Sequence, residues 1–484
     1  MRKTKIIATI GPSSDSEMKI EQLILAGVNV FRFNFSHGTQ EYHEANLVKI
    51  RDISARLKQH IGILADISGP KIRLGQIDGE ILLNVGDILE IHKENITGKD
   101  NKVSLNQPQI LDDLKLGDFV YISDGTIRLE VVEIYGDKIN AKTIVGGKIT
   151  SKKGVNFPGT RISINPITKK DEDDIRFGCK IGVDFFALSF VTSKQNIIDA
   201  KNIINSQNFD AHVFAKIERF EALECIDEIL EVSDGIMVAR GDLGVELGIE
   251  LVPVYQKMLI EKANEFSKPV ITATQMLSSM LTSQYPTRAE VSDIANAVLD
   301  GTDCVMLSDE TTVGKYPVEA INILNKVLIE TEKIYPYYKY LSSDLCQEHA
   351  ISASADMLAR NIKANAMIVY TKTGDSAIVT SKFRPQCKIF ANSFTEATLR
   401  RLSIVWGVEP CYTIPLDDSF QDHSDYIIHE FLKRAFADNK VDPSWSYVVT
   451  FGKPLGQSLH SNTIRLIDKN AVKNFEDNIG KLEG

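Results

Sequence analysis

Two short apolar runs in the middle of the chain each end at residues that could bind a metal ion. One run, Val213 to Ala215, is followed by Lys216 and Glu218, and the other, Ile236 to Ala239, is followed closely by Asp242. Short apolar runs of this kind are typical of buried parallel strands. Mg²⁺ is usually bound by one or two carboxylates, with phosphate and water completing its coordination shell. The sequence therefore predicts that Glu218 and Asp242 hold a divalent ion beside a cationic group.

The position of the lysine strengthens this metal-site hypothesis. Lys216 stands between the apolar residues Phe214 and Ile217. A buried ammonium group needs an anionic partner, whereas a lysine that only reaches into solvent does not require this placement. Nearby, Gly241 and Gly244 leave room for a ligand to approach bare backbone amides. For either segment alone, the alternative is a strand-to-helix turn that carries surface charges.

A second candidate segment alternates polar and aromatic residues. Arg32, Asn34 and Ser36 are separated by Phe33 and Phe35, so in an extended segment the three polar side chains point to one side. The planar fork of an arginine suits bidentate binding of a phosphate. A solvated strand end is the alternative. His37 fits a hydrogen-bonded structural or nucleotide-edge residue better than a metal ligand, because no partner histidine stands at ligand spacing.

Hydroxyl and carboxyl groups follow two later apolar runs. Thr274 ends the run that starts at Pro269, and Ser308 and Glu310 follow the run from Asp303 to Leu307. Each of these residues could cap a following helix, which is the bland interpretation. At the mouth of a barrel, each could instead bind a substrate oxygen or relay a proton.

A hydroxyl-rich loop near the C-terminal end suggests a phosphate site. Thr371-Lys372-Thr373-Gly374-Asp375-Ser376 follows an apolar run and precedes a helical pattern. Hydroxyls, a glycine and a helix N-terminus together favour an anion. An ordinary helix N-cap has the same composition, so both interpretations stay open.

The order of the predicted elements points to a TIM barrel. Three strands lie before Ser68 and five after Pro166, and most are followed by a helical pattern. Eight such steps over roughly 250 residues make a (β/α)8 barrel, which places its active site at the C-terminal ends of the strands. Polar residues follow nearly every predicted strand. An open doubly wound sheet is the alternative, which the count of eight disfavours.

The remaining segments predict two further domains. From Lys71 to about Pro166 the pattern is alternating runs and Gly-Asp or Asp-Gly turns, which favours a small antiparallel β-barrel inserted in a loop. From about Tyr337 a separate α/β pattern begins. The predicted fold is therefore an α/β TIM barrel with an inserted β-barrel domain and a C-terminal α/β domain. The expected boundaries are 1–69 and 167–340 for the barrel, 70–166 for the inserted domain and 341–484 for the last domain.

Composition limits the function classes. The 484-residue chain is 43% hydrophobic and 25% charged, which is typical of a globular protein with a large core. Its net charge of -10 argues against a nucleic-acid partner. No apolar run is long enough to span a membrane or to form a signal-peptide core. The six cysteines are widely separated, so reduced thiols and a cytoplasmic location are expected.

These motifs closely resemble those of pyruvate kinases. The matching stretches run in family order through both barrel segments and the insertion, and the resemblance is looser after residue 345. They are Thr4-Lys5-Ile6 with Ile10-Gly11-Pro12, Asn34 to Gly38, Gly69 to Arg73, Lys153 to Asn156, Lys216-Ile217-Glu218, Ala239 to Gly244, Ala273 to Met276 and Pro286 to Glu290.

The resemblance implies phosphoryl transfer from phosphoenolpyruvate to ADP, giving pyruvate and ATP, which is the last step of glycolysis. It also implies roles for individual residues. Arg32 and Lys216 would contact the transferring phosphoryl group, Glu218 and Asp242 would hold Mg²⁺ or Mn²⁺, and the Gly241 and Asp242 backbone would receive the substrate carboxylate. Thr274 would lie by the substrate, near the face where the enolate is protonated, and Ser308 and Glu310 would belong to a proton relay. The residues implied on the nucleotide side are Asn34, His37, Arg73 and Lys153.

The resemblance further implies a homotetramer with an effector site in the last domain. Thr371, Lys372, Thr373 and Ser376 match the effector phosphate loop, whereas Asp375 stands where related enzymes often carry arginine. A sugar monophosphate or AMP is therefore expected in preference to a bisphosphate.

One departure concerns a monovalent cation. The family K⁺ site matches Asn34, Ser36, Asp66 and Ile67, but Lys71 replaces the glutamate of the potassium-dependent branch. Because a fixed ammonium group supplies the positive charge and repels a second cation, K⁺ is not expected to be required.

Two other function classes are compatible with parts of this pattern. A metal-dependent lyase or aldolase could use the same barrel and carboxylate pair, but it would not need Arg73 and Lys153 on an inserted domain. A non-catalytic nucleotide sensor would not need the intact set of Lys216, Glu218 and Asp242.

Overall fold

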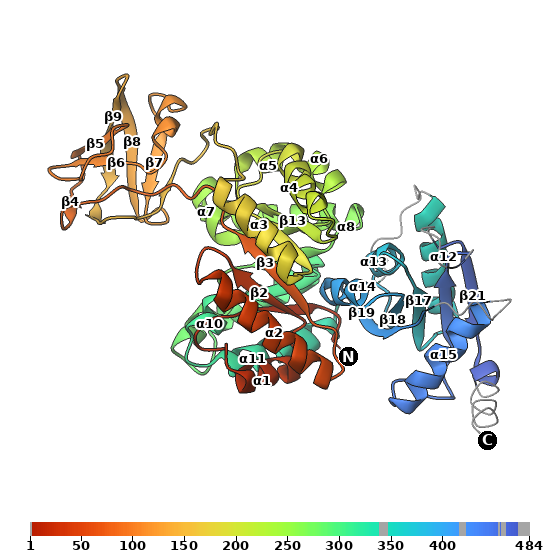
Figure 1. The fold of residues 1–484 in the computed structure, drawn as a ribbon. Coiled ribbons are helices and arrows are strands. Elements are labelled where there is room, and N and C mark those ends of the chain that lie inside the picture. The colour runs from red at the N-terminus through yellow and green to blue at the C-terminus, as the bar shows by residue number, and fades with distance from the viewer. Residues whose placement is uncertain (1, 338–346, 416–422, 454, 456–460, 473–484) are drawn as a thin grey trace. The chain divides into compact units, whose positions relative to one another are not determined.

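Eight parallel strands close a barrel in this computed structural model, which describes residues 2–337, 347–415, 423–453, 455 and 461–472 (Figure 1). Around the barrel the strand order is β1-β16-β15-β14-β13-β12-β3-β2. Their bounds are β1 (Lys5–Thr9), β2 (Val30–Asn34), β3 (Gly62–Ile67), β12 (Phe185–Leu188), β13 (His212–Ile217), β14 (Gly235–Ala239), β15 (Val270–Ala273) and β16 (Cys304–Leu307). The predicted TIM barrel is confirmed.

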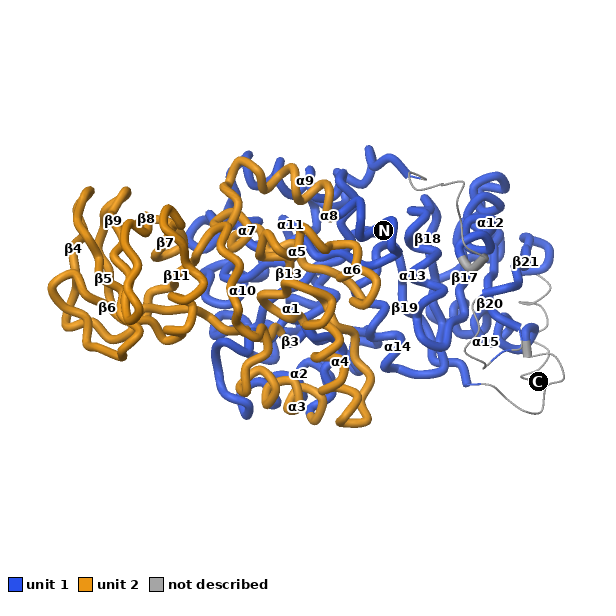
Figure 2. The backbone as a smooth tube through the Cα atoms, turned by 90° about the horizontal axis from the view of Figure 1, so that it is seen from above, with its two compact units in different colours: residues 1–65, 181–186, 260–484 blue, residues 66–180, 187–259 orange. Residues whose placement is uncertain are grey.

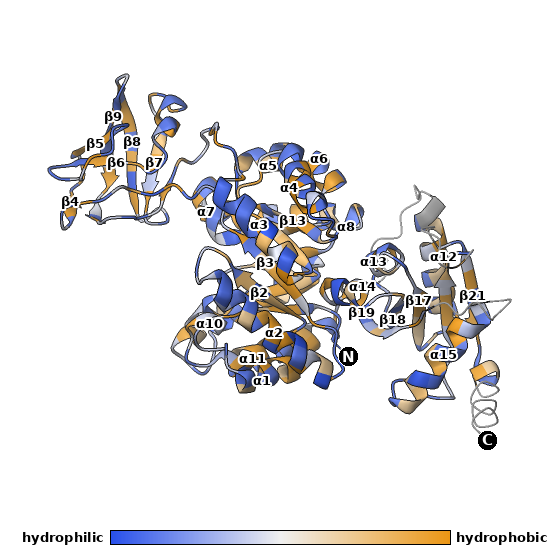
Figure 3. Cartoon of the chain, viewed as in Figure 1, coloured by the Kyte–Doolittle hydropathy of each residue, from blue (hydrophilic) through white to orange (hydrophobic). Residues whose placement is uncertain are grey.

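The barrel strands are mostly apolar because both of their faces are covered. Every residue of β1, β12 and β14 is buried. Parallel strands covered on both faces have this continuous apolar pattern instead of an alternating one. Figure 3 shows hydrophobic residues concentrated on such strands, with hydrophilic residues on the outer helices.

The helices between the strands begin and end at residues that suit those positions. In α1 (Glu17–Ala26) the Ser16 side chain accepts a hydrogen bond from the first turn, and Gly27 ends the helix in the left-handed conformation. A capping box of Thr287 and Glu290 opens α9 (Arg288–Asp300). The other long barrel helices are α2 (Gln40–Arg56), α3 (Lys169–Ile181), α4 (Lys194–Ser206), α8 (Val252–Glu265) and α11 (Pro317–Glu332).

The chain forms two compact units (Figure 2). Unit 1 contains residues 1–65, 181–186 and 260–484, and unit 2 contains residues 66–180 and 187–259.

Unit 2 contains the inserted β-structure. A six-stranded sheet has the order β11-β7-β8-β9-β5-β6, and β4 pairs with β10. Its core contains Leu89, Val120, Ile122 and Leu129, all fully buried. One pair, β5 with β6, is parallel, in contrast to the antiparallel pattern expected from the turns, because the chain between these strands crosses back to the same end. The strand bounds are β4 (Ile81–Leu83), β5 (Ile88–His92), β6 (Lys102–Ser104), β7 (Phe119–Ile122), β8 (Ile127–Ile134), β9 (Lys138–Val145), β10 (Gly147–Ile149) and β11 (Val155–Asn156).

A five-stranded sheet of order β19-β18-β17-β20-β21 forms the C-terminal α/β domain, which belongs to unit 1. All its neighbouring pairs are parallel except β20 with β21. Its elements are α12 (Gln347–Asn361), β17 (Ala366–Tyr370), α13 (Asp375–Lys382), β18 (Lys388–Ser393), α14 (Glu396–Arg401), β19 (Val408–Thr413), α15 (His423–Ala437), β20 (Tyr447–Phe451) and β21 (Thr463–Ile467).

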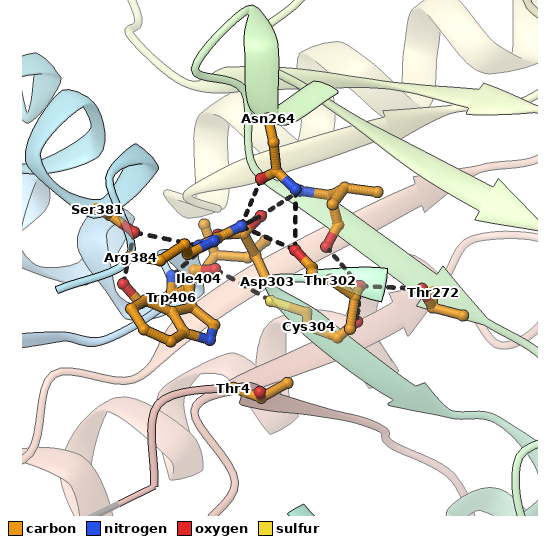
Figure 4. A network of polar contacts seen from close by, with 12 residues as sticks. Thr4, Asn264, Thr272, Thr302, Asp303, Cys304, Ser381, Arg384, Ile404 and Trp406 are labelled. Carbon is orange, nitrogen blue, oxygen red and sulfur yellow. Dashed lines mark hydrogen bonds and ion pairs between the residues drawn. The ribbon is translucent and has the colours of Figure 1, made fainter. Parts of the chain in front are cut away.

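A buried ion pair joins this domain to the barrel strand β16 (Figure 4). Arg384, two residues after the end of α13, donates to Asp303 Oδ1 at 3.0 Å and to the Gly301 carbonyl at 2.8 Å. The same Asp303 carboxylate accepts from the backbone N–H groups of Val270 and Trp406. Arg384 also lies 4.8 Å from the centre of the Trp406 ring. Both charges are buried, and each has the hydrogen-bond partners that a charge removed from water requires.

The described ranges carry five cysteines, and all five have free thiols, whereas Cys346 lies outside these ranges. Within the same ranges, no helix has both the length and the apolar character needed to cross a lipid bilayer.

Candidate active site

Lys216 lies at the centre of a cluster of polar residues at the strand ends in unit 2. Its ammonium nitrogen is 2.9 Å from Glu218 Oε1 and 3.1 Å from Asp66 Oδ1, and it donates to Ser189 Oγ at 2.6 Å. The Lys216 side chain is only 12% exposed. The predicted anionic environment of this lysine is confirmed, and its partners follow three strands at the end where such barrels place their active sites.

The carboxylate of Glu218 is fixed by the backbone of the neighbouring loop. Its Oε2 accepts from the Phe190 N–H at 2.9 Å, and the residue is buried. Phe190 itself has a φ of 57°, which is uncommon for a residue with a side chain. Gly69 packs against this loop with a φ of 66°, and a Cβ there would approach the Phe190 ring to 2.6 Å. A tightly packed loop therefore holds the Glu218 carboxylate through the Phe190 N–H.

Asp242 lies in the first turn of α7 (Arg240–Leu247), directly after β14. Strands β13 and β14 are neighbours and run parallel, as the sequence predicted, so their carboxylates emerge at the same end. The Asp242 side chain is exposed, but nearby protein atoms displace part of its water, and this effect together with the Glu218 carboxylate raises the pKa of Asp242, while Lys216 and Lys71 lower it. The two carboxylates therefore repel one another, and a divalent cation between them would relieve that repulsion.

Lys71 belongs to the same electrostatic cluster. The loss of water around it and the nearby Lys216 ammonium lower the pKa of Lys71, whereas Asp66 and Asp242 raise it. Lys71 is exposed, and its ammonium group is electrostatically coupled to both carboxylates.

The described residues do not by themselves form a complete metal-binding cage. Among the described residues, no group of three or more His, Cys, Asp or Glu side chains could hold a metal ion. Mg²⁺ commonly keeps several water molecules and uses substrate phosphates as ligands. The pair of Glu218 and Asp242 fits that kind of site.

The polar residues of the Arg32 segment lie in unit 1. Arg32 is half-buried between the fully buried Phe31 and Phe33, and its Nη1 donates to Thr9 Oγ1 at 3.0 Å. Asn34 Oδ1 accepts from the Ser36 N–H at 3.1 Å. His37 is exposed, and its carbonyl oxygen lies 2.9 Å from a ring nitrogen of His43. The expected extended geometry is confirmed for Arg32 and Asn34 but is wrong for Ser36, because β2 ends at Asn34 and the chain turns there.

Thr274 has an unusual backbone conformation at the end of β15. Its φ is 69°, and that of the following Gln275 is 55°. A β-branched residue in this region is a genuine outlier, and such strain collects at functional sites. The helix-cap alternative for Thr274 is wrong, because the following 3-10 helix η3 (Ser278–Leu281) starts at N-cap Leu277 and the next α-helix, α9, at N-cap Thr287.

Glu310 ties together the loops that follow β15 and β16. Its Oε1 accepts from the Leu277 N–H at 3.0 Å, and its Oε2 accepts from the Ser308 N–H at 2.8 Å. Ser308 is the N-cap residue of the short helix α10 (Asp309–Thr312), but its side chain makes no capping hydrogen bond. Glu310 therefore holds the backbone of Ser308 in place.

Arg73 and Lys153 lie on adjacent antiparallel segments of the inserted domain. Arg73 pairs with Gly154, and the Leu74 N–H donates to the Lys153 carbonyl at 2.9 Å. Both Arg73 and Lys153 are exposed, and Arg73 Nη1 donates to the Lys152 carbonyl.

The hydroxyl-rich loop closes on itself before α13. Thr371 Oγ1 accepts from the Gly374 N–H at 2.9 Å, and Gly374 has a φ of 110°. Thr373 donates its hydroxyl to the carboxylate of Asp375 at 2.7 Å. A negative charge therefore lies at this helix N-terminus, where an effector phosphate would otherwise be favoured.

Comparison with known proteins decides the family. A family model described as the pyruvate kinase barrel domain matches residues 1–321, and one described as the pyruvate kinase alpha/beta domain matches residues 349–467. Pyruvate kinases of Staphylococcus epidermidis and Staphylococcus aureus are 40% and 41% identical over 474 residues, covering 96% of this chain and 80% of each relative. The chain belongs to the pyruvate kinase family.

A solved structure agrees with this pyruvate kinase assignment. The crystal structure of a pyruvate kinase from Cryptosporidium parvum is 35% identical, with a TM-score of 0.90 and 96% of each chain covered. The activity of the chain is therefore phosphoryl transfer from phosphoenolpyruvate to ADP, and the lyase or aldolase alternative is not supported.

Two contacts of this pyruvate kinase site were not assigned from the sequence. Ser189 was not among the predicted site residues, yet it accepts from Lys216 and donates to the Ile67 carbonyl at 2.7 Å. Asp66 was assigned only to the family K⁺ site, yet it also pairs with Lys216. The signal available was their common position directly after or at the end of a barrel strand.

Proposed function

We propose that Lys216 and Arg32 neutralise the phosphoryl group during its transfer in this pyruvate kinase. A terminal phosphate oxygen of ADP attacks phosphorus, the bond from phosphorus to the enol oxygen breaks, and the enolate takes a proton at carbon. Phosphoryl transfer depends on alignment and on neutralising charge more than on covalent chemistry. The observation that carries this assignment is the buried ammonium of Lys216, held between the carboxylates of Asp66 and Glu218.

Glu218 and Asp242 are the proposed ligands of Mg²⁺ or Mn²⁺. A divalent ion bound there would neutralise charge on the phosphoryl oxygens. The raised pKa of Asp242, caused by loss of water and by Glu218, supports a site that gains from a cation. The backbone of Gly241 and Asp242, in the first turn of α7, is the proposed receptor of the substrate carboxylate, because helix N-termini favour anions.

Thr274, Ser308 and Glu310 are the proposed residues for protonating the enolate. The strained Thr274 backbone supports a functional role for its hydroxyl, which would lie by the substrate. Glu310 would act through the backbone of Ser308 by fixing its position.

Asn34, His37, Arg73 and Lys153 are the proposed nucleotide-side residues. Arg73 and Lys153 are exposed cationic residues on adjacent segments of the inserted domain, which suits phosphate binding. In this proposal the inserted domain closes over the barrel mouth and excludes water.

Lys71 is the proposed substitute for a monovalent cation. The family K⁺ site would use Asn34, Ser36, Asp66 and the Ile67 carbonyl. The mutual electrostatic influence of Lys71, Asp66 and Asp242 supports an ammonium group that supplies this positive charge. We therefore infer that the enzyme does not require K⁺.

Assembly and regulation complete the proposal. We infer a cytoplasmic homotetramer whose last domain binds a sugar monophosphate or AMP through Thr371, Lys372, Thr373 and Ser376. The Asp375 carboxylate, bonded to Thr373, disfavours a bisphosphate. The proposed domain boundaries stay at 1–69, 70–166, 167–340 and 341–484, and the boundary between residues 340 and 341 falls outside the described ranges.

The experiment is a coupled assay of ATP formation from phosphoenolpyruvate and ADP. It is run with and without Mg²⁺, with and without KCl, and with a panel of sugar phosphates and AMP. Activity that requires the divalent ion but not K⁺ supports the proposal. Activity that survives complete chelation contradicts the metal assignment, and activation by fructose bisphosphate alone contradicts the effector assignment.

A further inference from the structure

The chain returns from the inserted domain through residues 157–168, and a buried arginine holds this return segment. Arg219 is 6% exposed, and its Nη2 donates to the Thr160 carbonyl at 2.6 Å. The same guanidinium makes two hydrogen bonds to Glu221, at 2.8 and 3.1 Å. Because the guanidinium fork is planar and already fixed by Glu221, the Thr160 carbonyl is held in a defined position.

A buried carboxylate holds the same segment from the other side. Glu246 in α7 is 7% exposed, and its Oε1 lies 3.7 Å from Arg219 Nη2. Backbone hydrogen bonds from Gly159 and Phe220 reach this carboxylate. Glu246 Oε1 has no hydrogen-bond partner among the described residues. The carboxylate nevertheless accepts these two backbone hydrogen bonds and lies beside the Arg219 guanidinium, so it joins the return segment to the same buried group.

The return segment is also tied to the inserted sheet. The Thr160 hydroxyl donates to Asp118, which directly precedes β7, at 3.3 Å. Gly159 has a φ of 73°, and a Cβ added there would meet no atom within 4 Å. The segment therefore turns at Gly159 without being packed in, and Thr160 connects the inserted sheet to the helices around Arg219 and Glu246.

The two holding residues stand next to the proposed metal ligands. Arg219 follows Glu218 directly, and Glu246 lies one helical turn after Asp242 in α7. A movement of Glu218 would therefore also move Arg219, and a movement of Asp242 would also move Glu246, so either movement would reach the return segment.

We propose that Arg219 and Glu246 are positioning residues that fix the inserted domain relative to the proposed metal ligands, and so place Arg73 and Lys153 for the nucleotide. The inference rests on the proposed function for the roles of Arg73 and Lys153. It does not assign contact with substrate to Arg219 or Glu246.

A neighbouring ion pair provides a matched control. Arg161, the next residue in the return segment, bonds to Glu224 at 2.7 Å, but both side chains are more than half exposed. Exposed pairs of this kind contribute little, because water and salt screen them. Arg161→Ala should therefore leave the position of the inserted domain unchanged.

The test compares Arg219→Met, Arg219→Lys, Glu246→Gln and Arg161→Ala in the full chain. Amide hydrogen exchange in residues 157–163 measures whether the return segment is held, independently of activity. Arg219→Met and Glu246→Gln should speed exchange there about tenfold or more, because the first removes hydrogen bonds to the segment and the second replaces a charged acceptor with a weaker neutral one. Arg161→Ala should match the wild type, and Arg219→Lys should be intermediate.

Steady-state kinetics then separate positioning from general damage. A misplaced nucleotide side should raise KM for ADP about tenfold in Arg219→Met, with KM for phosphoenolpyruvate changed less than about twofold. Arg219→Lys should recover part of the loss. If Arg219→Met does not fold, the KM values for ADP and phosphoenolpyruvate are compared in Glu246→Gln, which keeps the shape of the side chain, and in Arg219→Lys, which keeps its charge.

Two results would overturn the inference. One is exchange in residues 157–163 that is the same in Arg219→Met, Glu246→Gln and Arg161→Ala. The other is an equal rise of both KM values, which indicates general damage. A wild-type enzyme that forms no ATP would instead contradict the proposed function, and the exchange comparison would still decide whether the residues hold the segment.

Discussion

The Lys216 ammonium lies 2.9 Å from Glu218 Oε1. Lys216, the proposed phosphoryl-binding cation, is therefore paired with Glu218, a proposed metal ligand. Asp66, at 3.1 Å, offers the lysine a second carboxylate. A metal ion at Glu218 would compete with Lys216 for that oxygen. We therefore expect Lys216 to turn toward the phosphoryl oxygens when the ion and substrate bind. Metal binding would then be coupled to the release of the Lys216 ammonium from Glu218.

Lys216→Met should lower kcat by about two to three orders of magnitude, while the affinity for phosphoenolpyruvate changes less. The physical reason is that a charge preorganised in a site shielded from water is worth about 3 kcal/mol in the transition state. Steady-state kinetics of ATP formation measure the effect. Lys194→Met, which removes an exposed lysine paired with Glu228, is the control and should leave kcat unchanged. Near-normal turnover in Lys216→Met would contradict the assignment.

Glu218→Gln and Asp242→Asn should each raise the Mg²⁺ concentration needed for half-maximal activity by about tenfold or more, because a hard cation loses an anionic oxygen. A Mg²⁺ titration at saturating substrates measures the shift. Glu224→Gln, an exposed residue of the same unit, serves as the control. An unchanged Mg²⁺ requirement in both variants would place the metal elsewhere.

The barrel and much of the site could be predicted from the sequence, because buried parallel strands are continuous apolar runs and their ends carry the polar residues. Lys216, Glu218 and Asp242 were found in this way. The pairing of Lys216 with Asp66 and Ser189 was not, because these partners come from other strands and depend on how the barrel closes. The left-handed backbone of Thr274 was also not predicted, because residue type alone disfavours that conformation.

Lys71 should make the enzyme independent of K⁺. In tetramethylammonium or Tris salts at matched ionic strength, added KCl should stimulate activity by much less than about tenfold, because the fixed ammonium already supplies the positive charge near Asp66 and Asp242. Lys71→Glu should create at least a partial K⁺ requirement, and the exposed Lys99→Glu should not. A tenfold or greater stimulation of the wild type by K⁺ would refute this expectation.

Asp356 in α12 should make the C-terminal domain less stable as the pH rises. Burial raises the pKa of Asp356 to about 7, with Arg360 opposing, and neither carboxylate oxygen has a hydrogen-bond partner among the described residues. Because the pKa of Asp356 is higher in the folded state than its ordinary value of 3.8, the protonated carboxyl contributes its full stability below pH 3.8. This contribution is lost as the pH rises from there through about 7. The loss could reach about 4 kcal/mol, since one pKa unit corresponds to about 1.4 kcal/mol.

Asp356→Asn cannot ionise, so its stability relative to the wild type should increase between pH 5 and pH 8. Urea unfolding at the two pH values, followed by tryptophan fluorescence, measures this difference, because the two tryptophans, Trp406 and Trp445, both lie in the C-terminal part of the chain. The control is Asp442→Asn. Asp442 is exposed, and its hydrogen bonds with Ser444 lower its pKa, so it is ionised at both pH values. If Asp356→Asn and Asp442→Asn respond equally to pH, the carboxyl of Asp356 does not carry this pH dependence.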